Sequence, residues 1–266
     1  MATPDAYTHG HHDSVLRSHR WRTAENSAAY LLPHLRRGMS LLDVGCGPGT
    51  ITFDLARRVA PGRVVGVDLS ADVIEEASHA VRAAGVDAVD LVVGDFRELD
   101  QGTFDVVHAH QVLQHLSDPV GALRAMGRLA RPGGVVAVRD SDYPAMLWAP
   151  ASDGLERWRG IYLAVTRRNR AHADAGRHLL GWAHRAGLSG PSYTTSTWTY
   201  ATRADRTWWA ELWAERITAS ALAVQAVDYD IATEAELADV ARSWREWAAE
   251  PDGVLVVVHG EVVARA

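Results

Sequence analysis

The chain has 266 residues, of which 47% are hydrophobic and 23% charged, a composition typical of a globular protein with a sizeable core. Its net charge of −6 leaves no basic surface for nucleic acid or anionic membranes, and no apolar run approaches the roughly 20 residues of a membrane helix. Cys46 is the only cysteine and lysine is absent, which excludes internal disulfides, cysteine-based zinc sites, pyridoxal-phosphate chemistry and lysine-containing phosphate loops. The N-terminal stretch is polar and has no signal-peptide core, so we expect a cytoplasmic protein.

The first half of the chain alternates between strand and helix signals. The sequence predicts, in order, a helix over Thr23–Leu35, a strand over Leu41–Val44, a helix over Ile51–Val59, a strand over Arg63–Asp68, a helix over Ala71–Ala84, strands over Val89–Val93 and Phe104–Ala109, a helix over Pro119–Ala130 and a strand over Val135–Asp140. Apolar strands that alternate with helices predict a doubly wound, mostly parallel α/β sheet with both faces covered.

The second half is richer in helix. It predicts a helix that ends near Gly187, a strand over Tyr193–Thr202, tryptophan-rich helices over Asp205–Ala226 and Thr233–Ala249, and a final strand or hairpin in "GVLVVVHGEVVARA". Thr233 and Glu236 form a capping-box pattern at the start of the last helix. No repeat or linker divides the chain, so we expect one domain over 1–266.

A glycine-rich loop, "LLDVGCGPGT", stands where the first strand turns into a helix. Glycines allow a ligand to approach the backbone, and the helix N-terminus offers free N–H groups. The dinucleotide-binding fingerprint would need a glycine at position 50, where this chain has Thr50. The pattern therefore disfavours a dehydrogenase and leaves the ligand to be identified from the neighbouring strands.

The next two strands end in carboxylates. Asp68 ends the second strand, where it can accept hydrogen bonds from both ribose hydroxyls of a nucleoside. Asp95 and Phe96 follow the third strand, where the carboxylate can bind the adenine amine and the ring can lie against the base. Together with the glycine loop, these residues predict a site for an adenosine whose 5′ substituent need not be a phosphate.

With these features in place, the chain resembles the class I S-adenosylmethionine-dependent methyltransferases of the ubiquinone/menaquinone-type and small-molecule group. The matching segments, in family order, are "LLDVGCGPGT", "VVGVDLS", "VVGDF", "FDVVHAHQVLQHLSDP" and "RPGGVVAVRD", and they cover about residues 40–140. The resemblance implies a Rossmann-like α/β fold with a seven-stranded sheet, S-adenosyl-L-methionine as cofactor, and methyl transfer to a small molecule by in-line displacement.

The resemblance also assigns roles to residues and segments. Gly45, Gly47 and Gly49 would approach the methionine moiety, Asp43 would orient the loop or meet the ammonium group, Asp68 and the following Leu69 would lie at the ribose, and Asp95 and Phe96 at the adenine. Residues 37–140 would form the cofactor-binding core. Residues 1–36 would form an N-terminal helical lid segment, and insertions at 141–173 and 203–250 the acceptor lid.

Three histidines, His108, His110 and His115, lie in one ten-residue stretch. His108 and His110 are two apart and point to one side of the fourth strand, and we expect His108 and His115 to be structural. His110 and Gln111 end this strand, where they can face cofactor or acceptor. His110 is our first candidate for a general base, with His12 or Tyr7 second if the N-terminal segment folds over the site. A metal set of His110, Asp140 and Asp142 is the rival interpretation, which we do not favour because the acidic triad of metal-dependent methyltransferases is not reproduced.

The expected acceptor is apolar or aromatic, because both insertions are rich in aromatic residues. Tyr143, Trp148, Trp209 and Trp213 are the candidates for contact with it. The acceptor atom, whether oxygen, carbon or nitrogen, is left open, and a homodimer is compatible with the sequence. Two alternatives remain: a cofactor-retaining enzyme that catalyses a cyclisation or rearrangement, and a non-catalytic nucleoside-binding protein.

Overall fold

The protein is described by a computed structural model, in which residues 8, 10, 12–84 and 89–266 are placed. The strands are β1 (Leu41–Val44), β2 (Val64–Asp68), β3 (Val89–Val93), β4 (Phe104–His110), β5 (Ala130–Ser141), β6 (Leu147–Ala149), β7 (Ser189–Tyr200) and β8 (Val254–Arg265). The α-helices are α1 (Asp13–Arg20), α2 (Ala24–Ser27), α3 (Thr50–Val59), α4 (Ala71–Ala84), α5 (Pro119–Leu129), α6 (Asp153–Arg168), α7 (Ala175–Ala186), α8 (Arg203–Ala219), α9 (Ala221–Asp228) and α10 (Glu234–Ala249). Short 3₁₀ turns are η1 (Leu32–His34), η2 (Phe96–Glu98), η3 (Leu113–His115) and η4 (Tyr143–Ala145).

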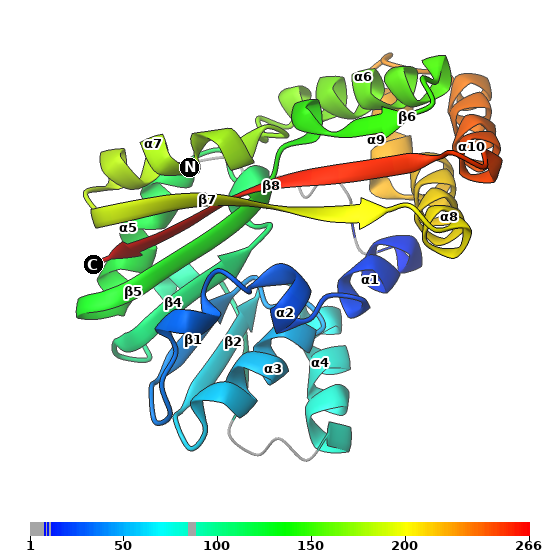
Figure 1. Cartoon of the computed structure of the whole chain (residues 1–266). Helices are drawn as coiled ribbons and strands as arrows, with labels where there is room; N and C mark the ends of the chain where they lie inside the picture. Colours follow the sequence, from blue (N-terminus) through cyan, green and yellow to red (C-terminus); the bar gives the residue numbers. More distant parts are fainter. Residues whose placement is uncertain (1–7, 9, 11, 85–88) are drawn as a thin grey trace.

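The sheet has the strand order β3-β2-β1-β4-β5-β8-β6, and β7 pairs with the other edge of β8 (Figure 1). Strands β1 to β5 are mutually parallel, and β8 runs antiparallel to its neighbours β5, β6 and β7. The predicted doubly wound, mostly parallel α/β sheet is thus confirmed. An eighth strand joins the seven expected ones, because the short β6 pairs with the beginning of β8, and the C-terminal segment is one long strand.

Two predicted helices are interrupted. The helix expected over Thr23–Leu35 is wrong as one element: α2 ends at Ser27, and η1 begins at Leu32 with Pro33, whose ring and missing N–H do not continue a helix. The helix expected over Asp205–Ala226 is divided at Ser220, which has an extended backbone. The Ser220 hydroxyl accepts a hydrogen bond from the Leu222 N–H and so caps the beginning of α9.

Strand residues alternate between the two faces of the sheet. Leu42 and Val107 pack toward α5 and α7, whereas Leu41 and Val106 pack toward α2 and α3. At the carboxyl ends of the strands, the face that α2 and α3 cover changes from apolar to polar. There the register places Asp43 beside His108, His110 beside Arg139, and Arg139 beside a glutamate of β8. The sheet therefore presents a row of buried polar side chains at the edge where ligands of α/β folds bind.

Helices α6, α8, α9 and α10 form a second core beyond this edge, which we call the helical layer (Figure 1). Its centre is a cluster of aromatic rings in which Trp158 lies 4.5 Å from Trp213 and 4.9 Å from Trp244, measured between centroids. Helix α1 joins the two parts, because Arg17 pairs with Glu215 of α8, and Arg20 pairs with Glu76 of α4 at 2.7 Å. Within the described residues, no helix has the length and apolar character needed to cross a membrane.

Candidate active site

The glycine-rich loop connects β1 to α3 and lies against a cavity at the carboxyl edge of the sheet. Gly45, Gly47 and Gly49 have φ values of +64°, +56° and +82°, in the left-handed region that favours glycine. A Cβ at Gly45 would lie 2.5 Å from Val112, and one at Gly49 would lie 2.4 Å from Phe53. At Gly47 such a Cβ would have one heavy atom of the described residues within 4 Å, apart from its chain neighbours, namely the His19 ring nitrogen at 3.8 Å. Gly45 and Gly47 line the cavity, whereas Gly49 is the N-cap of α3 and packs on Phe53.

Asp43, near the end of β1 and just before this loop, connects the loop to the neighbouring helix and strand. One carboxylate oxygen accepts the Thr52 hydroxyl at 2.5 Å and the other lies 2.7 Å from His108 Nδ1. Both partners are buried, Thr52 in α3 and His108 in β4. Asp43 therefore ties the loop to the strand and helix on either side, and it also contributes to the cavity wall. His108 has the structural environment that the sequence predicted.

Asp68 is held by backbone groups at the end of β2. Its carboxylate accepts the Gly47 N–H at 3.1 Å and the Ser70 N–H at 3.0 Å, one on each oxygen. The following Leu69 is 70% exposed and also lines the cavity. A carboxylate that is fixed by two N–H groups still has lone pairs for a ligand's hydroxyls. This geometry fits a ribose.

Asp95 and Phe96 lie next along the cavity, after β3. The Arg97 N–H donates to Asp95 at 2.9 Å and its guanidinium at 2.7 Å, and these hydrogen bonds lower the pKa of the Asp95 carboxyl. Phe96 is buried, with the Arg97 guanidinium 5.9 Å from its ring centre. The ionised carboxylate beside an apolar ring suits a base that carries an amino group. Cys46, between the glycines, is buried, and burial raises the pKa of its thiol, which disfavours the reactive thiolate.

His110 ends β4 and lines the cavity with only 6% of its surface exposed. Neither ring nitrogen has a hydrogen-bond partner within the described residues. Burial is the main cause that holds its pKa well below the usual value, and the charges of Arg22 and Arg139 lower it further. The imidazole is therefore neutral at physiological pH, with one nitrogen able to accept a proton. Its ring centre lies 6.4 Å from that of His259, in a stacked arrangement, and 5.9 Å from that of Trp198, whose ring is tilted by 47°.

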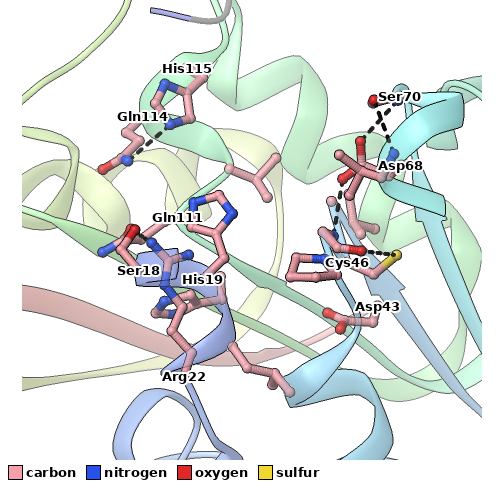
Figure 2. Close-up of a pocket in the computed structure, with 18 of the residues that line it drawn as sticks. Ser18, His19, Arg22, Asp43, Cys46, Asp68, Ser70, Gln111, Gln114 and His115 are labelled. Carbon is pink, nitrogen blue, oxygen red and sulfur yellow. Dashed lines mark hydrogen bonds between the residues drawn. The ribbon is translucent and has the colours of Figure 1, made fainter. Parts of the chain in front are cut away.

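Gln111 follows with a φ of +54°, so the chain turns sharply at the end of β4. The Arg22 guanidinium donates to its side-chain oxygen at 2.8 Å, and its amide nitrogen donates to the Ser141 hydroxyl at 2.7 Å. The same nitrogen lies 3.0 Å from His259. Figure 2 shows Arg22, His19 and Ser18 with Gln111 on one side of the pocket, and Asp43, Cys46, Asp68 and Ser70 on the other.

The far end of the cavity is aromatic and apolar. It is lined by Leu16, Tyr143, Met146, Trp198, Trp209 and Val257. Tyr143 and Trp209 were predicted for this role, but Trp148 and Trp213 do not line the cavity. Trp213 is fully buried between Trp158 and Trp244, and Trp148 lies under the Arg159 guanidinium at 4.6 Å. Helical spacing brings these two rings into the core of the helical layer, because the apolar face of a helix packs inward.

The N-terminal candidates are placed differently from each other. His12 is the N-cap of α1, where its ring nitrogen accepts the Ser14 N–H at 3.2 Å, and it does not line the cavity. Tyr7 lies outside the described residues. Helix α1 and the segment that follows it also contribute to the cavity wall, and their residues were not predicted: Ser18, His19 and Arg22. Trp198 in β7, whose role depends on the pairing of strands far apart in the sequence, was not predicted either.

The two carboxylates of the rival metal set, Asp140 and Asp142, have other partners. Asp142 forms a two-pronged ion pair with Arg177 at 2.6 Å, and Asp140 accepts the Gln114 N–H at 3.1 Å. Burial raises the pKa of Asp140 to about 8, so this carboxyl is mostly protonated at neutral pH. In the described part of the chain, no three His, Cys, Asp or Glu side chains gather as a metal site would require.

The fold is a mostly parallel α/β sheet with a cavity at the carboxyl ends of its strands, and comparison with known proteins identifies the family. A family model described as a methyltransferase domain matches residues 35–187. An uncharacterized methyltransferase of Schizosaccharomyces pombe is 31% identical over 97% of this chain and 95% of its own length. The demethylmenaquinone methyltransferase of Staphylococcus aureus is 35% identical over 42% of this chain and 47% of its own length.

A solved structure of a methyltransferase candidate from Bacillus halodurans shares the fold, with a TM-score of 0.58 at 18% identity over 89% of this chain and 97% of that one. The chain belongs to the methyltransferase family and is an S-adenosylmethionine-dependent methyltransferase of class I. The residues at the cavity fit the cofactor of that family. Gly47 offers an open backbone, Asp68 two oxygens for hydroxyls, and Asp95 with Phe96 a polar and an apolar contact for a purine.

Proposed function

We propose that this enzyme methylates a small aromatic or apolar molecule on oxygen, carbon or nitrogen. The observation that carries the proposal is the continuity of the cavity, which extends from the glycine loop to a wall of Tyr143, Met146, Trp198 and Trp209. An acceptor between these rings would lie next to the residues expected to hold the cofactor. The kinship with a demethylmenaquinone methyltransferase supports an aromatic ring as the acceptor.

In the proposed arrangement, Asp68 and Leu69 hold the ribose, Asp95 and Phe96 hold the adenine, and the glycine loop meets the methionine moiety. The bound cofactor supplies a methyl group that its sulfonium already activates. The protein therefore has to align the acceptor and exclude water, which can contribute roughly 7–11 kcal/mol. We assign the exclusion of water to α1 and the helical layer, which act as the lid. This assignment, a cytoplasmic location and a role in secondary metabolism are parts of the proposal.

His110 is the proposed general base for an acceptor hydroxyl. It is neutral and buried at the cavity wall, neither ring nitrogen has a hydrogen-bond partner within the described residues, and the unprotonated nitrogen can accept a proton. Because its pKa lies below the usual value, the ring stays unprotonated to lower pH than a free histidine. The rate with a phenolic acceptor should therefore not fall as the pH decreases from about 8 to 6.5, the ordinary histidine pKa. His110→Asn should lower turnover by roughly 10²–10⁴-fold.

The test is release of S-adenosylhomocysteine by the purified protein with a panel of phenols, quinones and heteroaromatic amines, with and without a chelator. Turnover with an aromatic acceptor supports the proposal, and loss of turnover with chelator would restore the metal mechanism. Consumption of an acceptor without release of S-adenosylhomocysteine would instead support a cyclisation or rearrangement. Full turnover by His110→Asn with a phenol between about pH 6 and 9 would remove His110 as the base.

A further inference from the structure

Gln111, at the cavity wall, has a side-chain amide whose orientation is fixed by its partners. The Arg22 guanidinium donates to the amide oxygen at 2.8 Å, and a guanidinium has no atom that could accept a hydrogen bond instead. The oxygen of the amide must therefore face Arg22, and the NH2 group must face the other way. That NH2 group has two hydrogens and two neighbours, Ser141 Oγ at 2.7 Å and His259 Nε2 at 3.0 Å.

The direction of these two hydrogen bonds determines where the neighbouring protons lie. Because the amide nitrogen can only donate, His259 Nε2 has to be an unprotonated acceptor, and the proton of the neutral ring is on Nδ1. Burial holds the pKa of His259 well below its usual value, which agrees with a neutral ring. Ser141 Oγ is an acceptor for the same reason, so its own proton points away from the Gln111 amide.

The Ser141 hydroxyl is thus left with a proton to donate. The side chain is 1% exposed and lines the cavity, and within the described residues the hydroxyl is the donor of no hydrogen bond. A buried hydroxyl proton without an acceptor costs free energy, and a bound molecule that supplies the acceptor removes this cost. The cavity wall therefore presents a hydrogen-bond donor of fixed direction at Ser141.

His110 offers the opposite kind of contact at the same edge of the sheet. It ends β4 opposite Arg139 of β5, and Ser141 follows two residues later on the same face of β5. The neutral His110 ring has one unprotonated nitrogen, and neither nitrogen has a hydrogen-bond partner within the described residues. A hydroxyl group of a ligand fits this pair, because its proton can go to the nitrogen while its oxygen accepts the serine proton.

From these contacts we infer that the acceptor is a phenol, and that Ser141 donates a hydrogen bond to the oxygen that is methylated. The inference rests on the proposed function and adds the class of acceptor and a further catalytic residue. An amine or a ring carbon would present no oxygen to Ser141, and the aromatic wall with Trp198 and Trp209 suits a phenol better than an aliphatic alcohol.

In the inferred step, the phenol proton passes to the unprotonated nitrogen of His110. A lone pair of the phenol oxygen forms the bond to the transferred methyl carbon, and the electron pair of the broken carbon–sulfur bond stays with the sulfur. Negative charge develops on the phenol oxygen before the new bond is complete, and the Ser141 hydroxyl stabilises that charge.

Matched phenols and amines test the inference directly. Para-cresol and para-toluidine, and 2-naphthol and 2-naphthylamine, have nearly the same shape and are uncharged at neutral pH, but only the phenols present an oxygen. We expect calorimetry in the presence of S-adenosylhomocysteine to show each phenol binding about tenfold more tightly than its amine. The quantity to compare between variants is this ratio of phenol to amine affinity, because a change in overall stability affects both affinities alike.

Ser141→Ala should reduce the ratio to near one and lower the turnover of the phenols by about tenfold to a hundredfold. Ser141→Thr should keep most of the ratio, because the hydroxyl remains. The matched control is Ser27→Ala. Ser27 is also 1% exposed, does not line the cavity, and its hydroxyl donates to the Asn26 side chain at 2.7 Å. This control should leave both the ratio and the turnover unchanged.

Three results would overturn the inference: equal binding of phenol and amine by the native protein, an unchanged ratio in Ser141→Ala, or an equal loss of the ratio in Ser27→Ala. An unchanged ratio together with weaker binding of S-adenosylhomocysteine by Ser141→Ala would assign the hydroxyl to the cofactor instead. Turnover of the amines but not of the phenols would overturn the inference and leave the proposed function standing. Failure of the native protein to bind S-adenosylhomocysteine at all would count against the proposed function itself, which keeps the two failures distinct.

Discussion

The two ends of the cavity are built in different ways. The end next to the glycine loop takes its residues from the turns after β1, β2, β3 and β4, within residues 43–112. The other end takes them from α1, η4, β7, α8 and β8, segments that lie as far apart as Leu16 and Val257. The first end presents three carboxylates, one of them paired with Arg97, together with backbone groups, and the second presents mainly aromatic and apolar side chains. In the proposed function the first end holds the cofactor and the second end the acceptor.

The two ends also depend on different cores. The glycine loop is supported by the sheet, through Asp43, Thr52 and His108. The aromatic end is supported by the helical layer, in which Trp158 and Trp213 are fully buried. Perturbing one core should therefore affect its own end of the cavity more than the other.

The largest effect is expected from Trp158→Ala in the helical layer. Removing a buried indole leaves a cavity among Trp213, Trp244 and Tyr162, so the free energy of unfolding should fall by about 3–5 kcal/mol. Urea denaturation measures this loss. Calorimetry under conditions where the variant is folded should show nearly unchanged binding of S-adenosylhomocysteine.

Val224→Ala is the control for this change, because Val224 lies on α9 of the same layer with 59% of its surface exposed. It should alter the free energy of unfolding by less than about 0.5 kcal/mol. If Trp158→Ala weakened cofactor binding as strongly as it weakened acceptor binding, the two ends would not be separately supported.

Asp68→Asn should have the next largest effect, at the opposite end. The substitution removes the negative charge of a carboxylate that accepts hydrogen bonds from two N–H groups and is expected to accept further ones from the ribose hydroxyls. The dissociation constant for S-adenosylhomocysteine should rise by roughly tenfold to a hundredfold, measured by calorimetry. Asp72→Asn, at an exposed position in the first turn of α4, changes the same charge away from the cavity. Equal binding by both variants would remove Asp68 from the cofactor site.

The sequence singled out most of the residues that line the first end of the cavity and few of those that line the second, for a physical reason. A glycine loop or an acidic strand end is a local signal, and parallel strands bring such turns to one edge whatever the rest of the chain does. Trp198 and Ser18 carry no such signal, because their positions depend on how β7 pairs with β8 and how α1 packs on α8. For the same reason periodicity could not distinguish Trp209, which lines the cavity, from Trp213, which is buried one turn later on the same helix.

The smallest expected effect is that of replacing His110, which lies between the two ends of the cavity. It changes how the free energy of unfolding depends on pH. The folded state holds the pKa of His110 below its usual value, whereas in the unfolded chain it titrates near the ordinary 6.5. Below that pH the unfolded chain binds a proton at His110 that the folded protein does not bind, so acidification favours unfolding. Above it His110 is neutral in both the folded and the unfolded state, and its contribution to the free energy of unfolding is fully present.

His110→Asn removes this proton uptake, so its free energy of unfolding should fall less steeply as the pH decreases from about 6.5 to 5. The difference in slope from the native protein should be at most about 1.4 kcal/mol per pH unit, measured by urea denaturation at several pH values. Val107→Ala, a buried change in the same strand that does not titrate, should lower stability by the same amount at every pH. Identical slopes for His110→Asn and the native protein would mean that the folded state protonates His110 as easily as the unfolded chain does. The imidazole would then be charged at mildly acidic pH, and the rate with a phenolic acceptor would fall there instead of staying level.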